Sequence, residues 1–370
     1  MTFLPDAERP DLTLGFVPLL DSALLVIARE AGFFADQGLD VTLARQNTWS
    51  TLRDKVAAGL LDGAQMLAPL PLAMSLGLGR APCETLAPVT LSRNGNALVL
   101  SERLAEASHA HLAVDPARGA RALAAALPTL PRPPRLAMVY PYSCQHYQLR
   151  HWLDLGGLDP QHDAELVVLP PPRMVDAMEA GEIDGFCVGE PWGSLAQHRG
   201  AGRIVATGAQ LWPEAPEKVL GVTRSWARCY PATLARLIVA LQRAGDWLAE
   251  DPGHARRTLE WLALPPYLDR SVAHLSRLAL NEAPMRQRLA GSLRPDPQAA
   301  AGFAEHLDQA LRREGRRLDQ ALRREGRRLD LAGLRACHDP VHYDAALHQA
   351  GADDAEGDAP PAPHPNSNPM

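Results

Sequence analysis

The strongest constraint on the fold is an internal repeat between residues 17 and 191. The pattern Ala-Gly-x-x-Asp-Gly occurs at residues 58–63 and again, 122 positions later, at residues 180–185. Three further pairs of short signals keep the same order at nearly the same offset: Val17-Pro18 with Tyr140-Pro141, Gly-Leu-Asp at 38–40 with 157–159, and Pro69 with Pro191. A repeated series of this kind predicts two lobes of similar design.

Each half of the repeat shows the same alternation of short apolar strands with helices. The expected strands lie at 12–16, 41–44 and 64–67 in the first half and at 136–139, 165–169 and 185–188 in the second. Strands that alternate with helices indicate parallel βαβ units. We therefore expect an α/β fold with two lobes, each a mainly parallel sheet flanked by helices, and a ligand cleft between them beyond the strand carboxyl ends.

The boundaries of the lobes follow from the repeat. We expect residues 11–94 and 215–345, with C-terminal helices, to form lobe 1, and residues 95–214 to form lobe 2. An Asn-Gly pair at 94–95 suits the tight crossover between them. Residues 351–370 are rich in Pro, Asp, Asn and Gly and have almost no large apolar side chain, which predicts a disordered tail.

Charge and cysteine usage narrow the class of protein. The 37 basic and 43 acidic residues give a net charge of −6, which disfavours a body that coats nucleic acid. The chain opens with acids rather than with a basic start followed by a long apolar run, so we do not expect a secretory signal. Five scattered cysteines without CxxC spacing suit reduced thiols. These features predict a cytoplasmic protein with no membrane association.

The loops at the expected strand carboxyl ends carry the candidate binding residues. They supply amides, aromatic N–H groups, imidazole, backbone N–H groups and one ammonium, a donor set that suits a small, singly charged anion. No Walker or GxGxxG loop is present to bind a nucleotide. The candidates are Trp49, Asn94, Asn96, Gln145, His146, Gly189, Glu190 and Lys218.

Each candidate also has an ordinary structural interpretation. Trp49 suits packing at a helix start, and Gly189 suits close packing of the backbone. Glu190 precedes Pro191, which is typical of the first turn of a helix, so Glu190 can be a boundary residue. Lys218 near the start of an expected strand can be a solvated edge charge, although only it and Lys55 among the 37 basic residues are lysines.

Four segments of the chain carry a family resemblance. Residues 15–21 (GFVPLLD), 65–73 (QMLAPLPLA), 183–192 (IDGFCVGEPW) and 217–223 (EKVLGVT) resemble the nitrate and bicarbonate solute-binding proteins of ABC importers. The resemblance covers about residues 11–290 and implies the two-lobed, periplasmic-binding-protein-like (type II) fold. Without a signal peptide, the chain is most similar to the cytoplasmic nitrate/nitrite sensors of the NasS type.

The resemblance implies a function and a set of contacts. Such a sensor is not an enzyme and uses no cofactor. It sequesters an RNA-binding antiterminator of the NasT type and releases it when nitrate or nitrite binds, which controls nitrate assimilation genes. Trp49, Gly189 and Lys218 match family anion-binding positions, and the crossover amide falls on Asn94 or Asn96. Gln145-His146 stands where the family has His-Asn, so an imidazole contact is lost or moved to His146.

Other functions fit less well. An exported binding protein of a nitrate or bicarbonate importer is the main alternative, since it would share every site residue. Thiamin-precursor synthases of related fold would require a Cys-rich cluster, and a regulatory domain fused to a transporter ATPase would require that ATPase. Cys144 and His146 diverge on a helix, and Pro340 separates His338 from His342, so neither a nucleophile pair nor a metal site is expected.

One segment is duplicated without change. Residues 307–317 (LDQALRREGRR) are repeated as residues 318–328, and their leucines follow a helical spacing. The simple explanation is a recent duplication tolerated on a surface helix. The functional one is a basic helix that contacts the antiterminator or its RNA.

Overall fold

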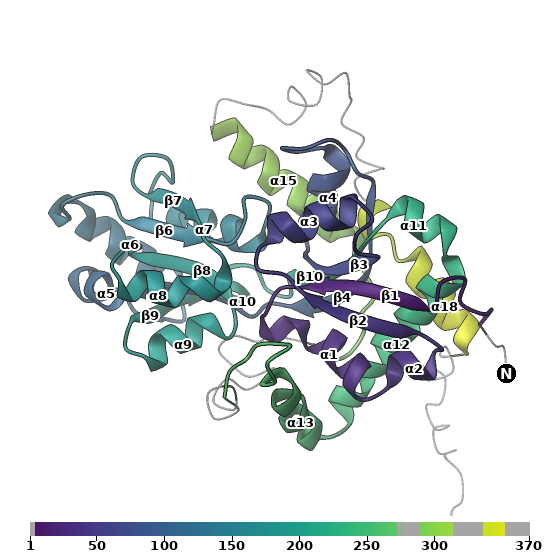
Figure 1. The fold of residues 1–370 in the computed structure, drawn as a ribbon. Helices are drawn as coiled ribbons and strands as arrows, with labels where there is room; N and C mark the ends of the chain where they lie inside the picture. The colour runs from purple at the N-terminus through teal and green to yellow at the C-terminus, as the bar shows by residue number, and fades with distance from the viewer. Residues whose placement is uncertain (1–3, 272–274, 276–288, 314–335, 352–370) are drawn as a thin grey trace, which may run out of the picture.

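The computed structural model describes residues 4–271, 275, 289–313 and 336–351, which form two lobes side by side (Figure 1). Of the duplicated segment, residues 307–313 belong to a described helix, whereas residues 314–328 lie outside the described residues. Residues 352–370 of the expected tail lie outside them as well. Among the helices described, none combines the length and the apolar character needed to cross a bilayer.

Lobe 1 is built on a five-stranded sheet with the order β2-β1-β3-β10-β4. Its central strands are mostly buried, because helices cover both faces of the sheet. Their bounds are β1 (Asp11–Phe16), β2 (Asp40–Arg45), β3 (Gly63–Leu67), β4 (Thr85–Arg93) and β10 (Pro216–Thr223). Strand β1 pairs in parallel with β2 and β3, whereas β10 runs antiparallel to both β3 and β4.

Lobe 2 repeats this sheet with the order β7-β6-β8-β5-β9. Its strands are β5 (Asn96–Ser101), β6 (Arg135–Met138), β7 (Glu165–Val168), β8 (Gly185–Gly189) and β9 (Gly202–Thr207). Strand β6 pairs in parallel with β7 and β8, and β5 runs antiparallel to β8 and β9. Each sheet is therefore mixed, with one reversed strand, and the expected two-lobed α/β fold is confirmed.

The chain crosses between the sheets twice, and the strand that follows each crossing is the reversed strand of the sheet it enters. It leaves lobe 1 between β4 and β5 and returns between β9 and β10. Strand β5 thus occupies in lobe 2 the position that β10 occupies in lobe 1. Both crossovers lie between the lobes, so the residues that start β5 and β10 lie at the lobe interface (Figure 1).

The aspartate of the repeated Ala-Gly-x-x-Asp-Gly pattern makes the same pair of hydrogen bonds in both lobes. Asp62 accepts from the N–H of Thr13 (2.8 Å), while its own N–H donates to the Thr13 carbonyl (2.9 Å). Asp184 makes the same pair of bonds with Arg135 (2.9 and 2.8 Å). Each carboxylate thereby joins the start of one strand to the start of its neighbour, at the edge of the sheet away from the other lobe.

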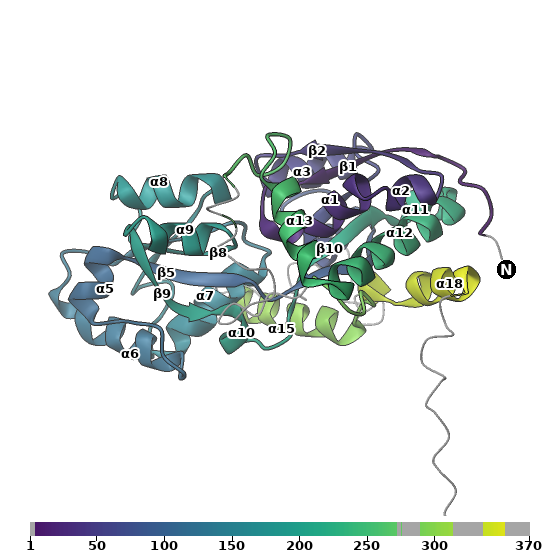
Figure 2. The ribbon, with the colours of Figure 1, turned by 90° about the horizontal axis from the view of Figure 1, so that it is seen from below.

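Helices cover both faces of each sheet (Figures 1 and 2). Lobe 1 carries η1 (Leu20–Ser22), α1 (Ala23–Glu30), α2 (Phe33–Asp36), α3 (Trp49–Ala57), α4 (Leu70–Leu76), α11 (Arg224–Cys229), α12 (Pro231–Glu250), α13 (Pro252–Leu262), α15 (Pro297–Arg313), η4 (Ala336–His338) and α18 (Val341–Ala350). Lobe 2 carries α5 (Glu102–Ser108), α6 (Ala117–Ala126), η2 (Leu127–Thr129), α7 (Cys144–Leu155), η3 (Pro171–Arg173), α8 (Met174–Glu179), α9 (Trp192–His198) and α10 (Gly208–Leu211).

The two lobes share one apolar cluster. It includes Val17 and Leu70 of lobe 1 together with Tyr147 and Phe186 of lobe 2, all of them buried. Helix α15 adds to this cluster and contacts both lobes, since it packs on α4 and η4 while His306 stacks on Tyr147 with ring centroids 5.7 Å apart. The two lobes are therefore packed against each other, and the part of their interface that this cluster forms is closed to solvent.

Candidate functional site

Lys218 lies at the centre of the lobe interface and is fully buried. Its ammonium pairs with the carboxylates of Asp21 (2.8 Å) and Glu217 (2.7 Å), and both acids are also buried. The interpretation of Lys218 as a solvated edge charge is therefore wrong. The expected lining of neutral donors and one ammonium also needs correction, because the ammonium already has two carboxylate partners.

Asp21 belongs to a network within lobe 1. It lies in the short turn η1, and its Oδ1 accepts from the amide of Gln65 on β3. The other amide atom of Gln65, Oε1, accepts from the N–H of Val17 (3.1 Å). Asp21 is thus fixed by the strand ends of its own lobe and presents Oδ2 to Lys218.

Glu217, in contrast, is held by lobe 2. Its Oε2 accepts from Nδ2 of Asn96 (2.7 Å), at the start of β5, and its Oε1 accepts from Nε2 of Gln145, in the first turn of α7. Gln145 also donates to Oδ1 of Asn96 (2.9 Å), and Asn96 donates to Oε1 of Gln148 (2.8 Å). The Glu217 carboxylate therefore joins the two lobes.

Trp49 approaches the same cluster from the first turn of α3. The helix starts here because Thr48 is extended and its hydroxyl accepts from the N–H of Thr51. The Lys218 ammonium lies 5.5 Å from the centroid of the Trp49 ring. The indole N–H of Trp49 is buried and has no hydrogen-bond partner among the described residues, and the same holds for Nε2 of Gln148.

Gly189 brings the end of β8 against this cluster. A Cβ at this position would lie 3.4 Å from Oδ2 of Asp21 and 3.6 Å from Oδ1 of Asn96. A larger side chain would therefore enter the charged cluster. The structure brings together Trp49, Asn96, Gln145, Gly189 and Lys218 of the predicted site residues, and we call these five with Asp21, Gln65, Gln148 and Glu217 the interlobe cluster.

Three other predicted residues lie apart from it. Nδ1 of His146 donates to the carbonyl of Pro141 (2.7 Å), and burial lowers the pKa of His146 to about 4, so this imidazole stays neutral at neutral pH. Asn94 turns the crossover with a φ of 56°. The Glu190 carboxylate accepts from the hydroxyl (2.8 Å) and N–H (3.2 Å) of Ser194 in α9, which fits a boundary residue.

Burial determines the electrostatics of the interlobe cluster. Desolvation raises the pKa of Asp21 and that of Glu217, and Lys218 opposes both shifts. The two carboxylates together overcome the burial of the ammonium and raise the pKa of Lys218. The charge is unequal, one cation to two acids, and a buried excess of charge is costly unless a proton or a ligand compensates it.

Sequence reasoning missed both carboxylates. In a regular strand Glu217 and Lys218 would point to opposite faces, but the pairing of β10 with β4 shifts register on both sides of Lys218. This bulge lets consecutive side chains reach the same interface. The signal for Asp21 was its position after the apolar run 16–20, where a buried acid needs a partner.

The other candidate chemistries have no support in the described residues. The Cys144 thiol is buried and donates to the carbonyl of Pro216 (3.3 Å), and burial raises its pKa well above the usual range, which disfavours a thiolate nucleophile. Nε2 of His338 bonds to the carbonyl of Ala68 (3.1 Å). Across the described ranges, no three His, Cys, Asp or Glu side chains are grouped in a way that could hold a metal ion.

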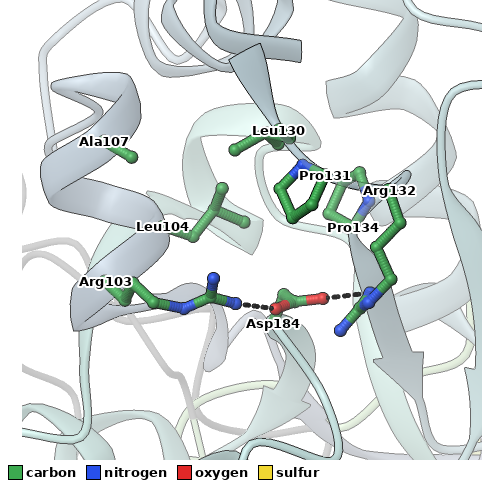
Figure 3. A pocket seen from close by; sticks show the side chains of 8 residues that line it. All are labelled: Arg103, Leu104, Ala107, Leu130, Pro131, Arg132, Pro134 and Asp184. Atoms are coloured by element: carbon green, nitrogen blue, oxygen red, sulfur yellow. Dashed lines mark hydrogen bonds and ion pairs between the residues drawn. The ribbon is translucent and has the colours of Figure 1, made fainter. Parts of the chain in front are cut away.

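A cavity of about 280 Å³ lies elsewhere, at the outer edge of lobe 2 (Figure 3). Arg103 and Arg132 enter it from opposite sides, and each pairs with Asp184, at 2.8 and 2.7 Å. Asp184 is also the carboxylate that joins the starts of β6 and β8. We call this region the outer pocket, and its cations already have a structural partner.

Comparison with known proteins identifies similar sequences. Residues 5–263 match the model of the NMT1-like family. The chain is 43% identical over 277 residues to the nitrate import ATP-binding protein NrtC of Synechocystis sp., covering 74% of this chain and 40% of the relative. It is 34% identical over 274 residues to the nitrate/nitrite binding protein NrtA of Synechococcus elongatus, covering 72% of this chain and 60% of the relative. The chain thus spans less than two thirds of these relatives.

Solved structures show the same fold. The periplasmic nitrate-binding protein NrtA from Synechocystis superposes with a TM-score of 0.80 at 24% identity, covering 93% of this chain and 90% of that one. The alkanesulfonate-binding protein SsuA from Xanthomonas axonopodis gives a TM-score of 0.61 at 20% identity, covering 83% and 94%. At these identities the likeness concerns the two-lobed architecture.

Proposed function

The chain belongs to the NMT1-like family, and on this premise we propose that it is a solute-binding protein that takes nitrate or nitrite between its lobes. The anion would bind in the interlobe cluster, in contact with the Lys218 ammonium and the Trp49 indole. Named relatives support this class of ligand, since the proteins called nitrate/nitrite binding protein NrtA align over most of the chain.

The observation that carries the proposal is a set of buried donors without acceptors. The Trp49 N–H and Nε2 of Gln148 have no hydrogen-bond partner among the described residues. An ammonium has three N–H donors, and the two carboxylates of Asp21 and Glu217 leave one of them. Buried donors are normally satisfied, and a small oxyanion supplies acceptors alone.

Closure of the lobes gives the binding step a mechanical consequence. The N–H of Leu20 in lobe 1 donates to the carbonyl of Glu190 in lobe 2 (2.8 Å), and Arg53 donates to the hydroxyl of Tyr140. An anion that contacts donors of both lobes would favour this closed form, by the difference between its affinities for the closed and open forms.

We propose that the cell uses this step for sensing. In that role the protein works in the cytoplasm and sequesters an RNA-binding antiterminator of the NasT type, which it releases when nitrate or nitrite binds. Linkage then requires the partner to weaken nitrate binding by the same factor by which nitrate weakens the partner. The resemblance in the EKVLGVT segment (217–223) and its neighbours supports the anion site that this role requires.

Import of nitrate is the second candidate role. It is favoured by the relatives at 43% and 34% identity, whose names place them in nitrate import or nitrate binding. Fractionation of cells that carry the tagged chain, followed by co-purification with and without nitrate, separates the roles. A cytoplasmic complex with an antiterminator that nitrate dissociates supports sensing, whereas an exported or transporter-bound chain supports import.

The site itself is tested by Trp49→Phe, which keeps an aromatic ring and removes the indole N–H. A hydrogen bond to a charged group is worth about 1.5–3 kcal/mol, so we expect nitrate affinity to fall about ten- to a hundredfold in calorimetric titration. Trp226→Phe is the matched control, because the Trp226 N–H donates to Asp62 at the outer edge (3.1 Å). Equal affinity in Trp49→Phe and wild type would reject the assigned site.

A further inference from the structure

The Glu217 carboxylate occupies the donors that an anion between the lobes would need. It accepts from the Lys218 ammonium of its own lobe (2.7 Å) and from the amides of Asn96 (2.7 Å) and Gln145 in lobe 2. A carboxylate and a nitrate or nitrite ion are all small, planar and singly charged, and they accept the same kinds of bonds. The closed structure is thus joined by an acceptor that belongs to the chain itself.

Asp21, unlike Glu217, does not accept from the lobe 2 amides of Asn96 and Gln145. Its carboxylate accepts from Gln65 and pairs with Lys218, and both of these partners belong to lobe 1. An incoming anion can leave these contacts in place and still reach Lys218. To reach the lobe 2 amides, however, the anion has to displace the Glu217 carboxylate from Asn96 and Gln145.

The net charge of the cluster determines whether the displaced Glu217 carboxylate takes up a proton. The protein groups of the cluster include one ammonium and two carboxylates, each buried. Adding an anion raises the buried negative charge by one, and a displaced carboxylate would also lose its donors. If one proton binds to a Glu217 carboxylate oxygen as the anion enters, the total charge of the cluster does not change and a neutral carboxyl remains.

We propose that Glu217 is an internal competitor for the anion, and that nitrate or nitrite enters the interlobe cluster together with one proton, which Glu217 takes up. This rests on the proposed function. It adds a regulatory property to the site, because the affinity for the anion becomes dependent on pH through one named carboxylate.

The groups that face Glu217 support this assignment. They are Lys218 on its own strand, Asp21 in η1, Cys144 in α7 and Cys187 on β8. Burial raises the pKa of both thiols well above their usual range, and the pKa of Lys218 is also raised, so none of the three releases a proton near neutral pH. Desolvation raises the pKa of Asp21 and that of Glu217. Only Glu217 would lose amide donors of lobe 2 to the anion, so this carboxyl accepts the proton.

The test is calorimetric titration of nitrate and of nitrite between pH 5.5 and 8.5, in pairs of buffers with different ionisation enthalpies. For the wild type we expect about one proton taken up per anion on the alkaline side. The affinity should then fall about tenfold per pH unit above the pKa of Glu217 and level off below it. Glu217→Gln should take up no proton and bind with an affinity independent of pH, more tightly than the wild type at pH 8.5.

Asp21→Asn is the matched control, since it removes the other carboxylate partner of Lys218 and leaves Glu217. We expect it to retain an uptake of about one proton per anion. Binding without proton uptake in the wild type, or uptake that persists in Glu217→Gln, would overturn the internal competitor while leaving the proposed function intact. No binding of either anion to the wild type or to Glu217→Gln at any pH would overturn both.

Discussion

The outer pocket and the interlobe cluster combine the same kinds of charges in opposite proportions. In the outer pocket two guanidinium groups share the single carboxylate of Asp184, and the side chains of Arg103 and Arg132 are 72% and 44% exposed. In the interlobe cluster two carboxylates share the single ammonium of Lys218, which is 0% exposed. The excess charge is solvated in the first region and buried in the second.

This difference separates a charged region that water can balance from one that water cannot reach. Water screens the excess cation of the outer pocket, so Asp184 joins strand ends without any need for a ligand. The interlobe cluster has no such screening, because its charges lie in a medium of low effective dielectric. Its imbalance makes the cluster sensitive to protons and anions, which suits a region where a ligand binds.

The largest expected effect is that of Lys218→Met. This substitution removes the only cation of the interlobe cluster and so leaves its two carboxylates without the charge that the outer pocket has in excess. Two buried carboxylates would then lack their ion-pair partner, and removing one member of a buried pair costs about 3–5 kcal/mol. We expect the free energy of unfolding, measured by urea denaturation, to fall by that amount at pH 8. The loss should be smaller at pH 5, where the carboxyls accept protons more readily.

Lys55→Met provides the control for this substitution. Lys55 is the other lysine of the chain, half-buried in α3, with its ammonium donating to the Gln46 side chain (2.9 Å). We expect a change within about 0.5 kcal/mol. A similar small change in Lys218→Met would show that the two carboxylates do not depend on this ammonium.

The outer edge of the fold could be predicted from the sequence because its signals are local. The glycines of the repeat have left-handed backbone conformations, with φ of 70° at Gly59 and 71° at Gly181. Three residues later Asp62 and Asp184 bond to the neighbouring strand start. Turn chemistry of this kind depends on a few adjacent residues, so it repeats in the sequence wherever it repeats in the structure.

The interlobe cluster was predicted only in part, because its charge pairing is not local. The loops that hold Trp49, Asn96, Gln145, Gly189 and Lys218 could be placed from the strand ends. The pairing of Lys218 with Asp21 joins residues 197 positions apart, and Glu217 reaches the same interface through an irregular strand register. Neither fact follows from hydrophobic periodicity, which assigns consecutive strand residues to opposite faces.

Glu190→Gln extends the comparison of the two regions to a third case. Glu190 is a buried carboxylate that has no ion pair among the described residues. Burial raises the pKa of Glu190 from 4.5 to about 7. A carboxyl whose pKa is raised in the folded state favours folding at low pH, and this contribution is lost as pH rises from about 4.5 to about 7. The shift corresponds to about 3 kcal/mol, so Glu190→Gln should lose that part of the decline, as measured by urea denaturation at pH 4.5, 6 and 8.

A second outcome for Glu190→Gln would contradict this expectation. If the stability of Glu190→Gln declines with pH as steeply as that of the wild type, Glu190 is ionised in the folded protein throughout this range. In that case the Ser194 bonds alone would satisfy the charged carboxylate, and burial without a cation would not be sufficient to shift its titration.

The smallest expected effects are those of Arg103→Ala and Arg132→Ala in the outer pocket, at about 0.5 kcal/mol each in urea denaturation, since exposed ion pairs contribute little. Each variant leaves Asp184 one guanidinium partner and the N–H of Arg135. The double variant leaves a mostly buried carboxylate without a cation, so we expect it to lose about 2 kcal/mol, more than the two single changes together. Strictly additive losses would mean that water and the N–H of Arg135 satisfy Asp184 without any cation. The outer pocket would then differ from the interlobe cluster by solvation rather than by its proportion of charges.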